Sequence, residues 1–526
     1  MTPTWRARVL ALLGAGTAVV LASMMPTMPA GASGFVAVSG SGSSWASVAI
    51  DLWAQDVRSN GLVVNYNPDG SAAGRGDYMA NQDDFAGSDP PFRDGQDKLG
   101  GTGAEHPSQG YSYVPDTAGG TAFIYHITVG GKLITNLRLD PKTIFEIFTG
   151  QIKNWDDHRI THIYGAQLPN LPITPVIRSD GSGATFFFTK WLSSLYPSAW
   201  NKFCDSVHPG IGSPCGNTEF YPQFGAAKAE NGSNNVITYI TSSFGNGSIG
   251  YDEYAYALNA HFPVVQVLNP DKYFVGPTAS NVAVALTQAI INTDKNSSNY
   301  LQQDLHKLYT FRDPRNYPIS SYSYLIVPRA GKPEPTNFSN AKGATLSTWI
   351  NFVLCAGQRQ MKQLGYSPLP ENLVQGGLTQ NGKIPGHVHV PSVNQLSNCD
   401  NPTMQNGHNI LLATAPEPSP CQKLGAPLNC VVKNGKAVAA GAGGNSAGPK
   451  ASASASAGAA TTGTGTGTGT TTGATGPVTG VVVNLAGDHS NQAALGALTA
   501  FGIVLAVALP PGLAVWLRRR RGQARG

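Results

Sequence analysis

The segment VIRSDGSGATFFFTKWLS places Arg178 and Asp180 two positions apart, immediately before a Gly-Ser-Gly turn. The planar guanidinium of Arg178 can hold two oxygens of a tetrahedral anion, a geometry that lysine does not reproduce. Asp180 could hold this guanidinium in place and moderate its charge. Ser182 would cap the next helix or bind the ligand, and the N–H groups of Gly183 and Ala184 would face outward at its positive end. The alternative is a surface ion pair beside a capped helix, which contributes little to stability.

Two earlier turns are also rich in glycine and hydroxyl-bearing residues. They are GSGSSW at residues 40–45 and PDGSAAGRG at residues 68–76. Hydroxyls and free N–H groups at the start of a helix can bind an anion without an excess of positive charge. Serine and glycine also cap helices and form turns in most proteins, so each turn taken alone is better explained by a structural role.

A further carboxylate follows a predicted strand in the segment QDDFAGSDPPF, where Asp89 precedes two prolines. A carboxylate that faces a dehydrated anion site would repel sulfate, which is fully ionised, but could accept a hydrogen bond from a protonated phosphate oxygen. Asp89 would then select phosphate by excluding the competing anion. The alternative is an aspartate that caps a turn.

The elements that must position these residues alternate between strands and helices. From residue 35 to about residue 394, short apolar runs alternate with helical patterns, which is typical of α/β domains. In such sheets, ligands bind at the carboxyl ends of strands and beside helix N-termini, where these turns are predicted to lie. Further along, ATLSTWINFVLCAGQRQMKQLG predicts one amphipathic helix that ends at Gly365.

The charge of the chain is sparse and unevenly placed. Charged residues make up 12% of the 526 residues, and the formal net charge is +5. Seven arginines lie at the two ends, namely Arg6, Arg8, Arg518, Arg519, Arg520, Arg521 and Arg525. The remainder is slightly acidic, so the sequence does not favour nucleic-acid binding.

The N-terminus, residues 1–32, has the features of a secretory signal peptide. A basic start is followed by an apolar stretch from Val9 to about Met24 and by a small-residue site at residues 30–32. An uncleaved N-terminal anchor is the alternative, although the apolar stretch is short for a membrane span.

The C-terminus predicts an anchor. Residues 493–517 contain no charged side chain and precede four arginines, so we expect a transmembrane helix with a basic cytoplasmic tail at residues 518–526. Residues 435–480 are rich in Gly, Thr, Ala and Ser, and we expect a flexible linker there. The sequence therefore predicts an exported domain on the cell-surface side of the plasma membrane.

The six cysteines of this exported chain predict disulfides, for which fifteen pairings are possible. The close pairs Cys204 with Cys215 and Cys421 with Cys430 would each close a short loop, which would leave Cys355 for Cys399. Metal binding is the weaker alternative, because no C-x-x-C motif or histidine cluster accompanies the cysteines.

Taken in order, seven motifs resemble those of one family. They are GSGSSW, DGSAAG, DDFAGSDPPF, IFTGQIKNWDD, RSDGSGAT, GSIGYDEYAYA and LGYSPLP, from about Gly40 to Leu373. The exported part resembles the phosphate-binding proteins of ABC-type phosphate importers, which are solute-binding proteins of the periplasmic type.

The resemblance implies a two-lobed α/β fold of type II, in which each lobe is a mixed sheet flanked by helices. Lobe I would contain residues 34–115 and 318–395, and lobe II residues 116–317. The ligand would lie in the cleft between the lobes, which closes around it. Residues 396–434, a cysteine-containing extension, fall outside the resemblance.

The resemblance also implies the ligand groups, and the sequence departs from the family pattern at three of them. The phosphate contacts fall on Ser44, Trp45, Ser71, Asp89, Arg178, Ser182, Gly183 and Ala184, and Asp180 falls on the aspartate that orients the arginine. Ser44 and Trp45 replace the usual threonine and phenylalanine but keep the donors. Ala184 replaces a threonine, so one hydroxyl is lost unless Thr185 or a water supplies it, while the N–H group remains.

The expected function is a monomeric, non-enzymatic, extracytoplasmic receptor that binds inorganic phosphate and delivers it to the permease subunits of an ABC importer, with no cofactor and no metal. One alternative is a receptor or sensor for another oxyanion that is not coupled to transport. A phosphatase is less favoured, because the site has no clustered metal ligands and no serine with a base partner. A stalked adhesion protein would use the RGD tripeptide at residues 75–77.

Overall fold

The computed structural model describes residues 34–440, except residues 101–102, 295–296, 298–299, 301, 334, 392–398 and 406–407. The predicted signal peptide, the linker beyond residue 440, the predicted transmembrane helix at residues 493–517 and the basic tail lie outside the described residues. Within the described part of the chain, no helix combines the length and the apolar character needed to cross a membrane.

The centre of the molecule is a mixed sheet of eight strands in the order β2-β1-β3-β15-β4-β10-β8-β9. The strands are β1 (Val38–Gly42), β2 (Val64–Asn67), β3 (Phe85–Ser88), β4 (Tyr111–Tyr125), β8 (Thr174–Arg178), β9 (Lys228–Glu230), β10 (Ser248–Glu253) and β15 (Ser320–Pro328). β1 runs parallel to β2 and β3, and β8 runs parallel to β9 and β10. Between these groups, β15 is antiparallel to β3 and β4, and β4 is antiparallel to β10.

Helices pack around this sheet at both of its ends. The helices are α2 (Ser47–Asp56), α3 (Ser71–Met79), α4 (Pro141–Phe148), α5 (His158–Tyr164), α6 (Gly183–Leu195), α7 (Pro197–Val207), α8 (Gly232–Thr241), α9 (Tyr254–Asn259), α10 (Ala279–Leu286), α11 (His306–Thr310), α12 (Asn340–Leu354), α13 (Met361–Leu364), α14 (Glu371–Asn381) and α15 (Ile410–Ala413). The remaining strands are short: β5 (Thr128–Val129), β6 (Lys132–Leu133), β7 (Arg138–Leu139), β11 (Gln266–Leu268), β12 (Phe274–Val275), β13 (Ile290–Ile291), β14 (Gln303–Asp304), β16 (Met404–Gln405), β17 (His408–Asn409), β18 (Cys430–Lys433) and β19 (Lys436–Ala439).

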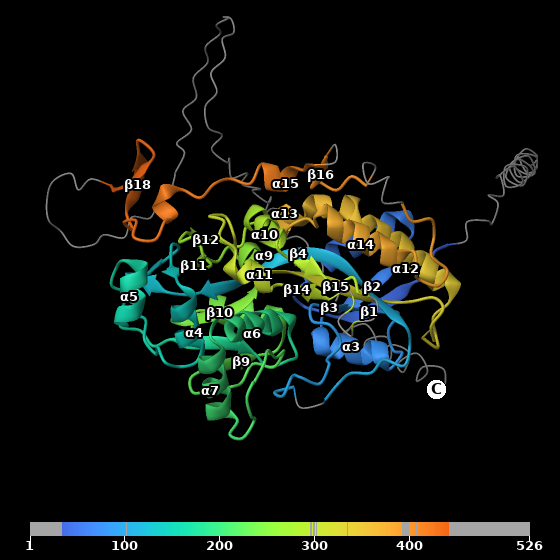
Figure 1. Cartoon of the computed structure of the whole chain (residues 1–526), viewed down its shortest axis with the longest axis horizontal. Helices are drawn as coiled ribbons and strands as arrows, with labels where there is room; N and C mark the ends of the chain where they lie inside the picture. Colours follow the sequence, from blue (N-terminus) through green and yellow to red (C-terminus); the bar gives the residue numbers. More distant parts are fainter. Residues whose placement is uncertain are drawn as a thin grey trace, which may run out of the picture. The chain divides into compact units, whose positions relative to one another are not determined.

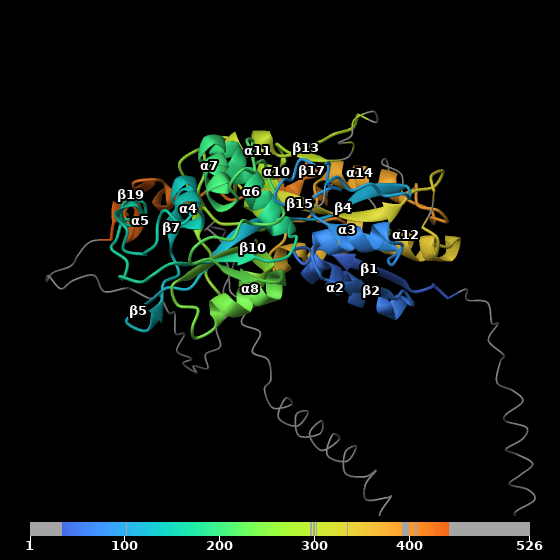
Figure 2. The same cartoon turned by 90° about the horizontal axis from the view of Figure 1, so that it is seen from below.

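Segments far apart in the sequence share each end of the molecule. In Figures 1 and 2, the N-terminal elements β1, β2 and α3 lie beside α12, while α4, α5, α6 and α7 lie at the opposite end. These two ends correspond to the residues predicted for lobe I and lobe II. The lobe boundaries themselves stay a prediction, since β4 runs through residues 115 and 116 without interruption.

The main apolar core is rich in aromatic side chains, and a second, smaller cluster contains Val176, Val236 and Ile240. Six tryptophans are less than 2% exposed, namely Trp45, Trp53, Trp155, Trp191, Trp200 and Trp349. Burial of such large apolar groups is the main favourable contribution to folding, so this core holds the ends of the strands around the site in fixed positions.

Three disulfides confirm the expected pairing: Cys204–Cys215, Cys355–Cys399 and Cys421–Cys430. Two details of the sequence interpretation are wrong. The helix predicted to end at Gly365 is interrupted at Cys355, after which a 3-10 turn leads into the short α13. The predicted linker does not begin at Gly435, because Lys436–Ala439 form β19, which pairs with β18. Backbone hydrogen bonds in this hairpin offset the lack of large apolar side chains.

Candidate functional site

Arg178 ends β8 and is held from one side by Asp180. The Nε atom of Arg178 donates to Oδ1 of Asp180 at 2.8 Å, and its Nη2 atom donates to Oδ2. The Oδ1 atom of Asp180 also accepts a hydrogen bond from the N–H group of Gly232, which begins α8, at 2.9 Å. These contacts place Asp180 against Arg178, as the predicted orienting role requires.

The other side of the Arg178 guanidinium faces two hydroxyls and a second carboxylate. Its Nη2 atom donates to Oγ of Ser44 at 2.9 Å, and its Nη1 atom donates to Oγ of Ser233 at 3.1 Å and to Oδ2 of Asp252 at 3.3 Å. Together with the bonds to Asp180, these contacts use all five N–H groups of the guanidinium. An anion can bind Arg178 only where it replaces one of these acceptors.

Asp89 follows β3 and is surrounded by hydroxyls. Ser43 donates to both carboxylate oxygens, at 2.8 and 2.9 Å, and Ser71 donates to Oδ2 at 3.1 Å. Asp89 is 1% exposed, and the hydroxyl of Ser71, which begins α3, also accepts from the N–H group of Asp89 at 3.3 Å. The carboxylate is therefore dehydrated, as its predicted selectivity role requires.

The start of α6 closes over Asp89. The hydroxyl of Ser182 caps this helix by accepting from the N–H group of Thr185 at 3.4 Å. Gly183 lies against the carboxylate of Asp89. Ala184 is buried, and the hydroxyl of Thr185 bonds to the hydroxyl of Tyr251 at 2.8 Å. The hydroxyl of Thr185 is thus bonded to Tyr251, and its replacement of the hydroxyl missing at position 184 stays a prediction.

The side chain of Trp45 is part of the core. Its ring contacts the rings of Phe187 and Tyr366, and the hydroxyl of Tyr366 donates to the carbonyl of Trp45 at 2.6 Å. These contacts fix the backbone at the start of α2. The ring is thus committed to packing, and the ligand contact through the backbone N–H group of Trp45, which the resemblance implies, stays a prediction.

Burial dominates the electrostatics of the site. Burial raises the pKa of Asp89, although the hydroxyls of Ser323, Ser43 and Ser71 and the charge of Arg178 oppose this effect. Burial would lower the pKa of Arg178, but Asp252 and Asp180 outweigh it and raise that pKa. Arg178 is therefore always charged. Burial would also raise the pKa of Asp180, but its bonds with Arg178 hold that pKa below the ordinary value.

The structure thus brings the sequence-predicted residues into one buried region, and it adds three that the sequence analysis missed: Ser43, Ser233 and Asp252. Ser43 and Asp252 lie inside recognised motifs, GSGSSW and GSIGYDEYAYA, which could have drawn attention to them. Ser233 has no comparable signal. The described residues hold no group of three or more His, Cys, Asp or Glu side chains that could bind a metal ion.

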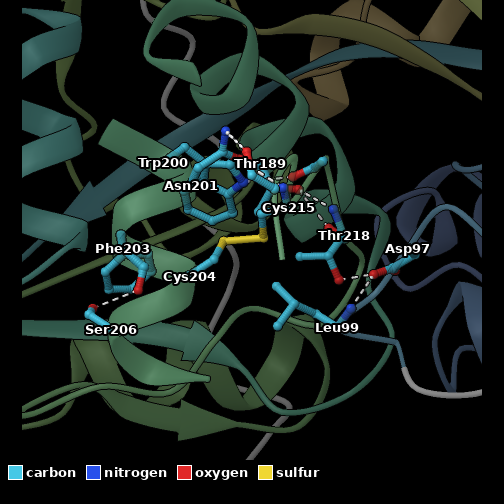
Figure 3. The surroundings of a disulfide bond; sticks show 12 residues. Asp97, Leu99, Thr189, Trp200, Asn201, Phe203, Cys204, Ser206, Cys215 and Thr218 are labelled. Atoms are coloured by element: carbon cyan, nitrogen blue, oxygen red, sulfur yellow. Dashed lines mark hydrogen bonds between the residues drawn. A yellow bond between two sulfur atoms is a disulfide. The ribbon is translucent and has the colours of Figure 1, made fainter. Parts of the chain in front are cut away.

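The RGD tripeptide cannot serve adhesion, because Arg75 is fully buried. Its Nε atom bonds Oε2 of Glu105 at 2.7 Å, and its Nη2 atom bonds Oε1 of Glu219 at 2.6 Å. Beside Glu219, the hydroxyl of Thr218 donates to Oδ2 of Asp97 at 3.0 Å. Figure 3 shows this contact next to the Cys204–Cys215 disulfide. Arg75 therefore joins α3 to the segment at residues 218–219, which belongs to the other predicted lobe.

A family model described as a PBP superfamily domain matches residues 29–357. The chain belongs to the PBP superfamily. The mixed sheet with helices at both ends agrees with this membership, and the predicted type II α/β fold is confirmed.

Relatives of this PBP-superfamily chain carry one common name. This chain is 27% identical over 348 residues to the phosphate-binding protein PstS of Methanocaldococcus jannaschii, and the match covers 64% of this chain and 83% of that protein. It is 29% identical to the phosphate-binding protein PstS of Xylella fastidiosa, covering 65% of this chain and 83% of the relative. It is 28% identical to the phosphate-binding protein PstS 2 of Mycobacterium tuberculosis, and the match covers 59% of this chain and 77% of the relative.

Solved structures of similar proteins include a putative phosphate ABC transporter substrate-binding protein with bound phosphate from Clostridium perfringens. Its TM-score is 0.40 at 19% identity, and the match covers 64% of this chain and all of that one. A high-affinity periplasmic phosphate-binding protein bound with phosphate gives a TM-score of 0.48 at 17% identity, with coverages of 71% and 99%.

Proposed function

We propose that the protein is an extracytoplasmic receptor that binds inorganic phosphate for an ABC-type phosphate import system. The observation that carries this proposal is the meeting of Arg178 and Asp89, both almost fully buried, in one region lined by serine hydroxyls. The names of the relatives support the same ligand. No reaction is needed for this function, and the relatives are named as binding proteins.

Phosphate would bind by replacing contacts that the protein makes with itself. Its oxygens would take the places at Arg178 now held by the hydroxyls of Ser44 and Ser233. The released hydroxyl of Ser44, with that of Ser71 and the N–H groups at the starts of α2 and α6, would donate to the same oxygens. Asp89 would accept from a protonated phosphate oxygen, a bond that sulfate cannot offer.

The site would close by movement of the two predicted lobes. Ser44, Ser71 and Asp89 belong to predicted lobe I, whereas Arg178 and the start of α6 belong to predicted lobe II. A closed, ligand-filled form could then be recognised by the permease. We further propose that the receptor is a monomer held to the outer face of the membrane by the predicted helix at residues 493–517. This part of the proposal is based on the sequence alone.

Calorimetric titration of the purified protein with phosphate, arsenate and sulfate tests the proposal, with a phosphomonoester hydrolysis assay alongside. We expect tight binding of phosphate, much weaker binding of sulfate and no turnover. Equal affinities for phosphate and sulfate would show that the site is a general oxyanion receptor. Hydrolysis of a phosphomonoester would point to the phosphatase instead.

A further inference from the structure

Arg178 has two buried acidic partners, and only one of them was expected. Asp180 is bound by the Nε and Nη2 atoms. Asp252 lies at the end of β10, and its Oδ2 atom is 3.3 Å from the Nη1 atom. The side chain of Arg178 is 1% exposed and that of Asp252 is fully buried. Asp180 already binds the guanidinium through two atoms, so Asp252 adds a negative charge at the Nη1 atom that the orienting role does not require.

Asp252 is held firmly toward the part of Arg178 that faces the ligand position. The hydroxyl of Ser233 donates to Oδ1 of Asp252 at 2.9 Å and lies 2.9 Å from the hydroxyl of Ser44. The N–H group of Glu253 donates to the same carboxylate oxygen at 2.8 Å. Ser44, Ser233 and Asp252 therefore form one chain of contacts along the Nη1 and Nη2 atoms that an anion would need.

We propose that Asp252 is a specificity-determining residue of the anion site, which competes with the bound anion for Arg178 and disfavours anions of higher negative charge. This inference rests on the proposed function. With Asp89 and Asp180, Asp252 sets three carboxyl groups against one guanidinium. Because repulsion grows with the charge of the ligand, a dianion is penalised twice as strongly as a monoanion by the same carboxylate.

The groups around Asp252 determine how its effect varies with pH. Arg178 and Asp180 face it from the end of β8, Ser233 from α8 and Tyr256 from α9, while Tyr251 and Glu253 flank it on β10. On the neighbouring strand β4, the residue paired with Asp252 is Ala122. Burial raises the pKa of Asp252, and the charge of Arg178 opposes that effect. Asp252 therefore carries more negative charge as the pH rises.

The negative charge of phosphate also increases as the pH rises, because near neutral pH the monoanion gives way to the dianion. The penalty from Asp252 should then be larger at pH 8 than at pH 6. The test is calorimetry with inorganic phosphate on the full chain at both pH values, for the wild type and Asp252→Asn. We expect the substitution to tighten phosphate binding about fivefold or more at pH 8 and clearly less at pH 6. The same substitution should tighten sulfate binding at both pH values.

Asparagine keeps an acceptor for Arg178, and Asp252→Ser provides a second neutral variant whose fold is checked by thermal unfolding. Asp205→Asn, which neutralises an exposed aspartate on α7, is the matched control for a change in net charge. The inference is overturned if the wild type binds phosphate and both variants fold but bind it no more tightly than the wild type. That result would leave the proposed function intact. An equal gain at both pH values would also overturn it. A wild type that binds no phosphate would overturn the proposed function and the inference with it.

Discussion

Gly183, the first residue of α6, lies so close to the carboxylate of Asp89 that there is no room for a β-carbon between them. Gly183 belongs to predicted lobe II and Asp89 to predicted lobe I, so under the proposed closure this contact would form only in the closed site. Glycine at this position lets the two backbones approach, and it leaves the helix N–H groups free of steric cover.

We therefore expect Gly183→Ala to hold the site open. The added methyl group should cost about 1–3 kcal/mol of closure energy, which corresponds to a loss of phosphate affinity of roughly 5- to 150-fold. Calorimetry measures this loss, and thermal unfolding shows whether the fold survives. Gly76→Ala is the control, because a β-carbon at Gly76 in α3 would contact nothing within 4 Å. If both variants bind phosphate equally well, the closed contact is not needed for binding.

Replacing Arg178 by lysine should weaken phosphate binding by about 2 kcal/mol or more, since a buried charge-assisted contact is lost. A lysine ammonium cannot satisfy Asp180 on one side and an anion on the other with fixed geometry. Titration calorimetry gives the affinity. Arg315→Lys is the control, because its ion pair with Asp313 is partly exposed and should be worth little. An unchanged affinity in Arg178→Lys would show that the arginine does not bind the ligand.

Asp89→Asn should reduce the preference for phosphate over sulfate by about tenfold or more, because a like-charge contact of this kind costs several kcal/mol. Asparagine can still accept hydrogen bonds from Ser43 and Ser71, but it does not repel a fully ionised anion. The measurement is the ratio of the two affinities at one pH. The exposed Asp94, replaced in the same way, should leave that ratio unchanged. A preserved preference in Asp89→Asn would remove its selectivity role.

Glu219→Ala should destabilise the folded protein by about 3 kcal/mol, because it removes one of the two buried partners of Arg75. The contact joins the two predicted lobes, so phosphate affinity should fall as well. Thermal unfolding and calorimetry measure the two effects. Glu230→Ala breaks the more exposed contact with Lys228 and should have little effect on either quantity. A loss of stability without a loss of affinity would mean that the contact is not part of closure.

Glu253 should make the protein less stable as the pH rises above the ordinary glutamate pKa of 4.5, because burial and the nearby Asp252 raise its pKa in the folded state. The folded form then binds more protons than the unfolded form, and this advantage disappears at higher pH. Over the pH range in which only the folded form keeps the proton, stability falls by about 1.4 kcal/mol per pH unit. Melting temperatures between pH 5 and pH 8 measure the slope.

Glu253→Gln, which is neutral at every pH, should flatten that slope and raise the melting temperature at pH 8. Glu105 supplies a control of opposite sign. Burial would raise its pKa, but Arg75 outweighs burial and lowers it, so Glu105→Gln should destabilise the protein at neutral pH and matter less in acid. A Glu253→Gln variant with the wild-type pH profile would show that this carboxyl is not protonated in the folded protein.

Local patterns in the sequence were sufficient for the pair Arg178 and Asp180, because two residues so close in the chain meet as soon as the strand and turn form. They were not sufficient for Ser233 and Asp252, which lie 55 and 74 residues from Arg178. Which distant side chains reach a site depends on strand order, and a periodic pattern does not determine that order. The interruption of the predicted helix at Cys355 has a similar cause, since the disulfide to Cys399 ties the chain there to a separate segment.

The balance of charge around Arg178 also bears on how fast the ligand is captured. One guanidinium is surrounded by the carboxyl groups of Asp180, Asp252 and Asp89, so its field is cancelled within a few ångströms. Electrostatic steering, which speeds association of ions with oppositely charged clefts, has little to act on here. We therefore expect capture of phosphate to be limited by ordinary diffusion and by the proposed lobe movement, and to vary little with ionic strength. A high affinity would then come from slow release.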